Sequence, residues 1–250
     1  MGVRRIPVEK GHVTQFPESK RQQAAAKVEP KMPQLVLQAA TKKFDGGLTT
    51  KRRVVVLGID SSAAGWAITA QSVEDDTFYS WMFHSKYTGQ LRIYDLGGFI
   101  VQQLKSIRMQ TGGIEHIVME GYGFASQMAH TIGEIGGLTK YLLLCEFGYA
   151  KPLGYPTYLT PSQLKKFVTG HGGSAKNPMP KSQVIAHVLK ATGIHFTDDN
   201  LCDSWCCAQV SKALYVGPSN LLSHQKEVLA NLSEHPEWPM NQQQSKHTRR

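Results

Sequence analysis

Two apolar runs in this chain each end in a single carboxylate. The run 54–59 leads into Asp60, and the shorter run Ile117-Val118-Met119 leads into Glu120. Apolar runs of this length, bounded by glycine and charge, are typical of buried strands. A carboxylate at the end of a buried strand is unfavourable unless something compensates its charge. The pattern therefore predicts two buried strands whose last residues are functional acids.

The pattern around these runs predicts alternating strands and helices. Residues 66–71 and 78–85 are expected to form strands that continue the first strand as an antiparallel meander. Apolar positions three and four residues apart predict a helix at 93–109. Further expected elements are helices at 127–147, from Pro161 onward, at 181–191 and at 200–215, and a short strand at 156–159. Together they predict an α/β fold with a mixed five-stranded sheet flanked by helices.

The segments on either side of this domain lack sustained periodicity. Residues 1–50 contain four prolines and scattered glutamines, which predict a mostly disordered arm with a short helix near 34–43. Residues 217–250 form a polar tail with a short helix expected around 220–231. The chain is therefore predicted to consist of an arm at 1–50, a domain at 51–216 and a tail at 217–250.

The positive charge is concentrated in the arm. Residues 1–53 hold 12 Lys and Arg against 4 Asp and Glu, which gives +8 of the net charge of +9. Residues 54–216 hold 12 of each kind. A basic arm ahead of a neutral domain is frequent in nucleic-acid binders, because its cations neutralise phosphates. A solvated tail without a partner is the alternative interpretation.

Targeting signals and cysteines bear on the compartment. The sequence contains no run of 18 apolar residues, so no membrane span is predicted. The N-terminus lacks the apolar core of a signal peptide. The cysteines lack the paired spacing of disulfide frameworks or zinc sites, and they stand at positions 145, 202, 206 and 207. We therefore expect buried free thiols and an intracellular, reducing, DNA-containing compartment.

A third acidic group completes a candidate metal site. The segment 198–203 opens the last helix of the domain, and its Asp199 and Asp203 share one helical face. Convergence of this group with Asp60 and Glu120 would require cations, and hard oxygen ligands suit Mg²⁺ or Mn²⁺. Two such ions can stabilise the attacking and the leaving oxygen when a phosphodiester bond is cleaved. The pattern predicts a metal-dependent nuclease, with an ordinary helix cap at 198–200 as the alternative.

Four segments, in order, resemble the RuvC-type Holliday junction resolvases of the RNase H-like superfamily. Residues 58–62, Gly-Ile-Asp-Ser-Ser, are similar to the family's first-strand motif Gly-Ile-Asp-Pro-Gly, and 118–122 resemble its second motif. Residues 163–170 with 181–184 resemble its basic segment, and 199–208 resemble its last motif, Asp-x-x-Asp-Ala. The resemblance covers residues 53–215 and implies an RNase H-like fold.

The chain departs from the family pattern at two places in the predicted site. Ser61 and Ser62 replace Pro-Gly, and Asn200 stands where the family has its third acid. Asp198, Asp199 and Asn200 are therefore all candidates for the third metal position, and Asp199 is preferred.

The resemblance and the chemistry together imply roles for the four carboxylates. Asp60 would bridge two metal ions, Glu120 would hold one of them, and Asp203 with Asp199 would hold the other. Lys165 or Lys181 would offset the charge that develops on the phosphate.

Residues outside the carboxylate set are the expected DNA contacts. Lys165, Lys166 and Lys181 form the basic segment. Tyr122 and Phe124 follow Glu120 and are expected to stack on bases opened at a junction, with core packing as the alternative.

These residues imply an endonuclease that cleaves four-way DNA junctions by paired nicks, as a homodimer with one active site per strand. The glycine-containing helix at 127–147, with Leu138, Tyr141, Leu142 and Leu144, is its expected interface. The alternatives are an RNase H-like nuclease acting on flaps, forks or RNA–DNA hybrids, and a DNA-binding protein without catalysis. An actin-like ATPase is disfavoured, because a second phosphate-binding hairpin is missing from the sequence.

Overall fold

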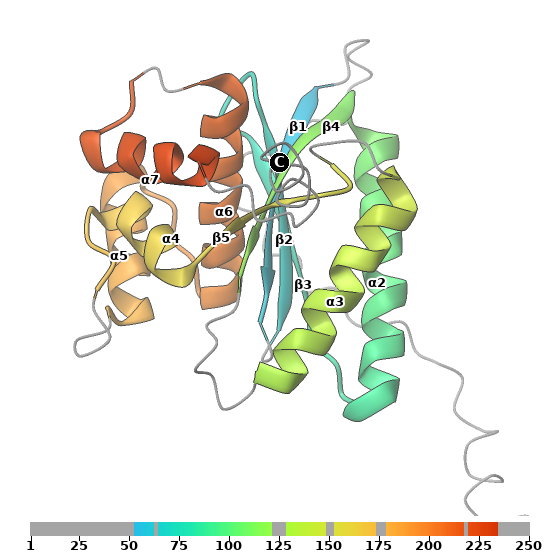
Figure 1. Ribbon diagram of the computed structural model, residues 1–250. Coiled ribbons are helices and arrows are strands. Elements are labelled where there is room, and N and C mark those ends of the chain that lie inside the picture. Colours follow the sequence, from blue (N-terminus) through green and yellow to red (C-terminus); the bar gives the residue numbers. More distant parts are fainter. Residues whose placement is uncertain are drawn as a thin grey trace, which may run out of the picture. The chain divides into compact units, whose positions relative to one another are not determined.

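Five strands form one mixed sheet in the computed structural model, which describes residues 53–62, 65–121, 129–148, 153–173, 179–217 and 220–234. The strands lie in the order β3-β2-β1-β4-β5 (Figure 1). Their bounds are β1 Val54–Ser61, β2 Trp66–Ser72, β3 Phe78–Phe83, β4 Gly113–Glu120 and β5 Thr157–Leu159. The pairs β1–β2 and β2–β3 are antiparallel, whereas β1–β4 and β4–β5 are parallel. The predicted α/β fold with a mixed five-stranded sheet is confirmed.

Helices cover both faces of this sheet (Figure 1). One face is covered by α2 Gly89–Gln110 and α3 Ala129–Phe147, and the other by α6 Asp199–Val216. Beyond α6 lie α4 Pro161–Thr169, α5 Lys181–Thr192 and α7 Ser223–Glu234. Each face has its own hydrophobic core.

The central strand β1 is buried on both faces, which explains its nearly continuous apolar sequence. Because side chains alternate along a strand, Val55, Leu57 and Ile59 enter the core beneath α2 and α3. Gly58 and Asp60 consequently face α6 on the other side. The alternation of β1 thus directs its only carboxylate toward the helix that carries Asp203.

The segment after residue 216 contributes to the packed structure. Helix α7 begins three residues later than the expected helix, and its Val228, Leu229 and Leu232 are buried. They share one core with Leu164 and Phe167 of α4. The expected boundary between domain and tail at 216/217 therefore does not mark the end of the packed fold. The arm at 1–50 and its expected helix lie outside the described residues.

Three of the four cysteines are buried as expected. Cys202, Cys206 and Cys207 lie inside the fold on α6, whereas Cys145 on α3 is exposed, and all four are free thiols. The expectation of burial was wrong for Cys145, because its helix covers the sheet from outside and turns this position to the surface. No helix in the described part of the chain combines the length and apolarity that a bilayer crossing requires.

Candidate active site

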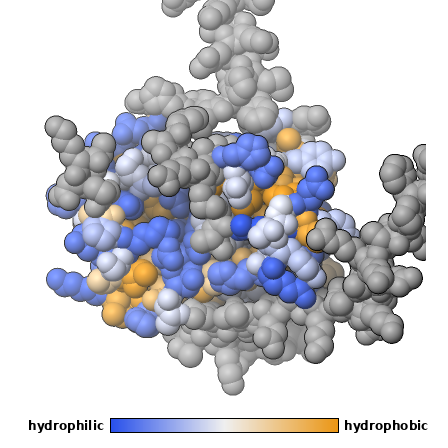
Figure 2. Space-filling view, turned by 90° about the horizontal axis from the view of Figure 1, so that it is seen from below, coloured by the Kyte–Doolittle hydropathy of each residue, from blue (hydrophilic) through white to orange (hydrophobic). Residues whose placement is uncertain are grey.

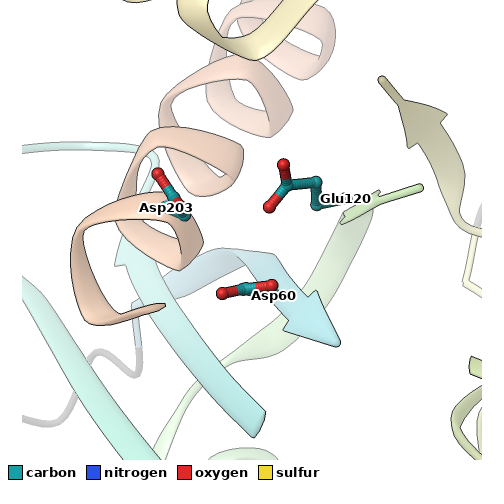
Figure 3. A group of neighbouring side chains, drawn as sticks. All are labelled: Asp60, Glu120 and Asp203. Atoms are coloured by element: carbon teal, nitrogen blue, oxygen red, sulfur yellow. The ribbon is translucent and has the colours of Figure 1, made fainter. Parts of the chain in front are cut away.

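Three carboxylates converge where β1 and β4 end beside the first turns of α6 (Figure 3). Oxygen atoms of Asp60, Glu120 and Asp203 lie within 4.8 Å of one another. The parallel pairing sets Ile59 opposite Met119, so the next residues of both strands reach the same edge of the sheet. Asp60 is 3% exposed and Asp203 is 8% exposed. Three of the four predicted carboxylates thus form one buried cluster.

The close approach of α6 to β1 depends on Gly58. A Cβ atom at this position would lie 2.1 Å from the backbone nitrogen of Ala208 and 2.1 Å from the carbonyl oxygen of Ser204. Both atoms belong to the backbone of α6, so no side-chain adjustment relieves the contact. The absence of a side chain at residue 58 therefore allows Asp203 to reach Asp60.

The other polar residues at the start of α6 have structural partners. The Asp198 side chain caps the helix, accepting hydrogen bonds from the backbone nitrogens of Asn200 (2.8 Å) and Leu201 (3.2 Å). The Ser62 hydroxyl lies 2.8 Å from Asn200 Oδ1 and 2.6 Å from the Gly65 carbonyl oxygen. Asp198 and Asn200 are thus engaged in contacts that fix the helix, which leaves Asp199 as the candidate for the third metal position.

The Ser62–Asn200 contact joins the two positions at which the sequence departs from the family pattern. Each departure is visible in the sequence, whereas the contact between them is visible only in the structure. The sequence does contain a hint of this contact, because both replacements occur in the same chain. A serine in place of glycine and an asparagine in place of the third acid can form a hydrogen bond to each other.

Asp199 lies outside the cluster of three and contacts Lys181 instead. Lys181 Nζ donates a hydrogen bond to Asp199 Oδ2 and lies 3.4 Å from Asp203 Oδ2. Lys165 Nζ donates to the carbonyl oxygen of Met179 at 2.8 Å, and so holds the segment that leads into α5. Lys181 therefore lies directly beside the acids, and Lys165 is close enough for its charge to lower the pKa of Glu120.

The remaining predicted DNA contacts are Lys166, Tyr122 and Phe124, and the structure describes only Lys166. Lys166 Nζ forms an ion pair with Glu227 of α7. Tyr122 and Phe124 lie outside the described residues.

Burial raises the pKa of all three clustered carboxyl groups. The pKa of Asp60 lies well above its ordinary range because of burial, and Glu120 and Asp203 raise it further. Burial and the neighbouring Asp203 raise the pKa of Glu120 to about 8, against the opposing effect of Lys181 and Lys165. Burial also raises the pKa of Asp203, which Lys181 counteracts. Complete ionisation of this cluster therefore needs additional positive charge.

The cluster has the properties of a site for a hard divalent cation. Asp60 Oδ2 is buried and has no hydrogen-bond partner among the described residues. A buried carboxylate oxygen without a donor is costly, and a cation would provide the missing partner. The donor atoms are all carboxylate oxygens, the ligands that Mg²⁺ and Mn²⁺ prefer. The residues present fit such an ion.

The raised pKa of Glu120 has a consequence for stability. Between its ordinary pKa of 4.5 and the folded value of about 8, the folded state keeps a proton that the unfolded chain releases. Each carboxyl group in this condition lowers the free energy of unfolding by up to about 1.4 kcal/mol per pH unit as pH rises. The metal-free protein is therefore expected to lose stability between pH 5 and pH 8.

Urea unfolding of the metal-free protein at several pH values measures this dependence, with Glu120→Gln as the comparison. The variant should show a flatter dependence on pH, and Mg²⁺ should stabilise the wild type most at pH 8. An identical slope in the wild type and the variant would contradict the assignment to Glu120.

Comparison with known structures identifies the fold. The chain is similar to T. thermophilus RuvC in complex with a Holliday junction substrate, with a TM-score of 0.50 and 16% sequence identity over 68% of this chain and 99% of that one. Another Thermus thermophilus RuvC structure gives a TM-score of 0.46 and 21% identity, with coverage of 67% and 99%. No family model and no curated protein sequence matches the chain. The chain has the RuvC fold, so the expected resemblance is confirmed at the level of the fold.

Proposed function

We propose that this chain is a divalent-metal-dependent endonuclease that cleaves four-way DNA junctions. The observation that carries the proposal is the convergence of Asp60, Glu120 and Asp203 at one edge of a RuvC-type sheet. The unpartnered Asp60 Oδ2 supports a metal rather than a purely structural role. The similar RuvC structure contains a Holliday junction, which supports branched DNA as the substrate.

The proposed mechanism assigns a role to each residue of the site. Asp60, Glu120 and Asp203 would hold Mg²⁺ or Mn²⁺, with Asp199 as the additional ligand of a two-metal site. When bound, these ions lower the pKa of the attacking water and stabilise the leaving oxygen.

The chain itself contributes preorganisation and positive charge. Asp60 and Glu120 are fixed by paired strands and Asp203 by a tightly packed helix, so little reorganisation is needed on substrate binding. Lys181, next to Asp203, would offset the negative charge that increases on the phosphate during cleavage. Lys165 keeps the start of α5, and hence Lys181, beside the acids.

One face of the described part of the molecule is largely hydrophilic (Figure 2). Figure 2 shows the molecule from below, where hydrophilic residues predominate over smaller apolar patches on the described surface. Protein–DNA interfaces are more polar than protein–protein interfaces. We propose Lys165, Lys166 and Lys181 as DNA contacts because they belong to the basic segment, and Tyr122 and Phe124 because they follow Glu120 in the sequence.

The substrate is tested by comparing cleavage of a four-way junction, a flap and an RNA–DNA hybrid at equal concentration with Mg²⁺. The junction should be cleaved fastest, with nicks on two strands of like polarity. A supercoiled plasmid that extrudes a cruciform should give linear product without accumulation of the nicked circle, because both nicks are made in one encounter. Faster cleavage of the flap or the hybrid would contradict the junction assignment and favour the alternative RNase H-like substrates.

Paired nicks require two active sites on one junction, so we propose that the enzyme is a homodimer with two-fold symmetry. The expected interface residues Leu138 and Leu142 lie partly buried near Gly97 of α2, so substitutions there would also disturb the fold. Tyr94 on α2 and Tyr141 on α3 are 80% and 63% exposed and are better interface candidates.

The combination Tyr94→Asp with Tyr141→Asp is therefore expected to give a folded monomer. Light scattering at micromolar concentration should give the mass of two chains for the wild type and of one chain for the double variant. A wild type that has the mass of one chain, both free and on junction DNA, would exclude the paired-nick mechanism.

A further inference from the structure

Lys181 occupies a position that its own helix does not favour. It is the first residue of α5, whose N-cap is Pro180, and this end has neither a side-chain cap nor an acidic residue in its first turn. The N-terminus of a helix carries partial positive charge, so a cation there is unfavourable. Lys181 must therefore be stabilised by groups outside its helix.

Those groups are two acids of the candidate metal site. Lys181 Nζ contacts Asp199 Oδ2 and lies 3.4 Å from Asp203 Oδ2. Asp203 is a member of the buried cluster, and Asp199 is the fourth predicted ligand. A divalent cation held by Asp199 and Asp203 would use carboxylates that the ammonium group contacts in this structure.

We propose that Lys181 is an internal counter-cation that holds Asp199 and Asp203 in the metal-free protein and is released from them when a divalent cation binds. This inference rests on the proposed metal-dependent function. Release frees the ammonium group to contact a DNA phosphate, so metal loading and phosphate contact are linked through one side chain. Lys165 limits the movement, because its bond to the Met179 carbonyl oxygen retains the start of α5 beside the site.

The proposal is tested on the wild-type protein by the chemical reactivity of lysine amines. The full chain is treated with an amine-acetylating reagent with and without Mg²⁺, and each lysine is quantified by mass spectrometry. Lys190 is the matched control: it is exposed near the end of the same helix, roughly 13 Å away along the axis. Lys181 should become several-fold more reactive with Mg²⁺, while Lys190 should not change. Unchanged reactivity of Lys181 in protein that binds Mg²⁺ would overturn the proposal.

Metal affinity provides the second measurement. Calorimetric titration with Mn²⁺ should show that Lys181→Met binds the ion at least about tenfold more tightly than the wild type, because a competing charge is removed. Lys190→Met should bind as the wild type does. Equal affinity of Lys181→Met and the wild type would overturn this inference alone. A wild type that binds neither Mn²⁺ nor Mg²⁺ would overturn the proposed function as well, so the two failures are distinguishable.

Discussion

Asp60→Asn is expected to reduce junction cleavage by about a thousandfold or more while junction binding is retained. Asparagine has nearly the same shape as aspartate, so the packing of β1 against α6 should persist. Asp60 is the most buried acid of the cluster, and the substitution removes its negative charge. That charge is needed to hold a divalent cation. Single-turnover cleavage and a gel-shift assay on the same junction measure the two effects separately.

At neutral pH the same variant should be more stable than the wild type without metal, because asparagine does not ionise and so avoids the cost that burial imposes on the Asp60 carboxyl group, whose pKa is raised. Its metal-free binding to DNA should also be at least as tight, since one source of repulsion toward phosphate is removed. Asp76→Asn is the control, because the Asp76 side chain is 100% exposed. Loss of binding and cleavage to the same degree in a folded Asp60→Asn protein would contradict the metal role of this residue.

Gly58→Ala is expected to lower the free energy of unfolding by about 3 kcal/mol or more, at the upper end of overpacking effects. The added methyl group would lie 2.1 Å from two backbone atoms of α6, so the helix as a whole must move away from β1. That movement would separate Asp203 from Asp60 and reduce cleavage in whatever fraction remains folded.

The control for this substitution is Gly98→Ala on α2, where an added Cβ meets nothing within 4 Å. It should be neutral or stabilise the protein by up to about 1 kcal/mol, because alanine favours the helix. Urea unfolding of the wild type, Gly58→Ala and Gly98→Ala measures the three free energies of unfolding. Stability of Gly58→Ala equal to that of the wild type would show that the approach of α6 is not constrained as described.

The sheet and the carboxylate cluster were predictable because their physical causes are local in the sequence. An apolar run that ends in an acid indicates a buried strand whose last residue needs compensation, and both Asp60 and Glu120 satisfy this reasoning. Parallel pairing of β1 and β4 then brings the two acids to one edge. The face of β1 that meets α6 follows from the alternation of its side chains.

Contacts between distant segments were not predictable. The spacings from Asp203 to Asp199 and to Asn200 both keep the residues on one helical face, so periodicity does not distinguish the two candidates. The distinction comes from the Ser62–Asn200 hydrogen bond, whose partners are 138 residues apart. The pairing of Lys181 with Asp199 depends likewise on how α5 is placed beside α6, which no local pattern indicates.

The packing of α7 was missed for a different reason. Only three of its residues, Val228, Leu229 and Leu232, are buried hydrophobics, and they stand among polar neighbours. Such a segment becomes part of a core only when another helix offers an apolar surface. Here that surface is provided by α4, and composition alone does not reveal it.

The central claim is that Asp60, Glu120 and Asp203 together bind a divalent cation. Anomalous diffraction from crystals of the wild-type protein grown with Mn²⁺ tests this claim most directly. We expect an anomalous peak about 2 Å from carboxylate oxygens of all three residues. Crystals that contain Mn²⁺ at other positions, with no peak between these three carboxylates, would contradict the proposed metal site.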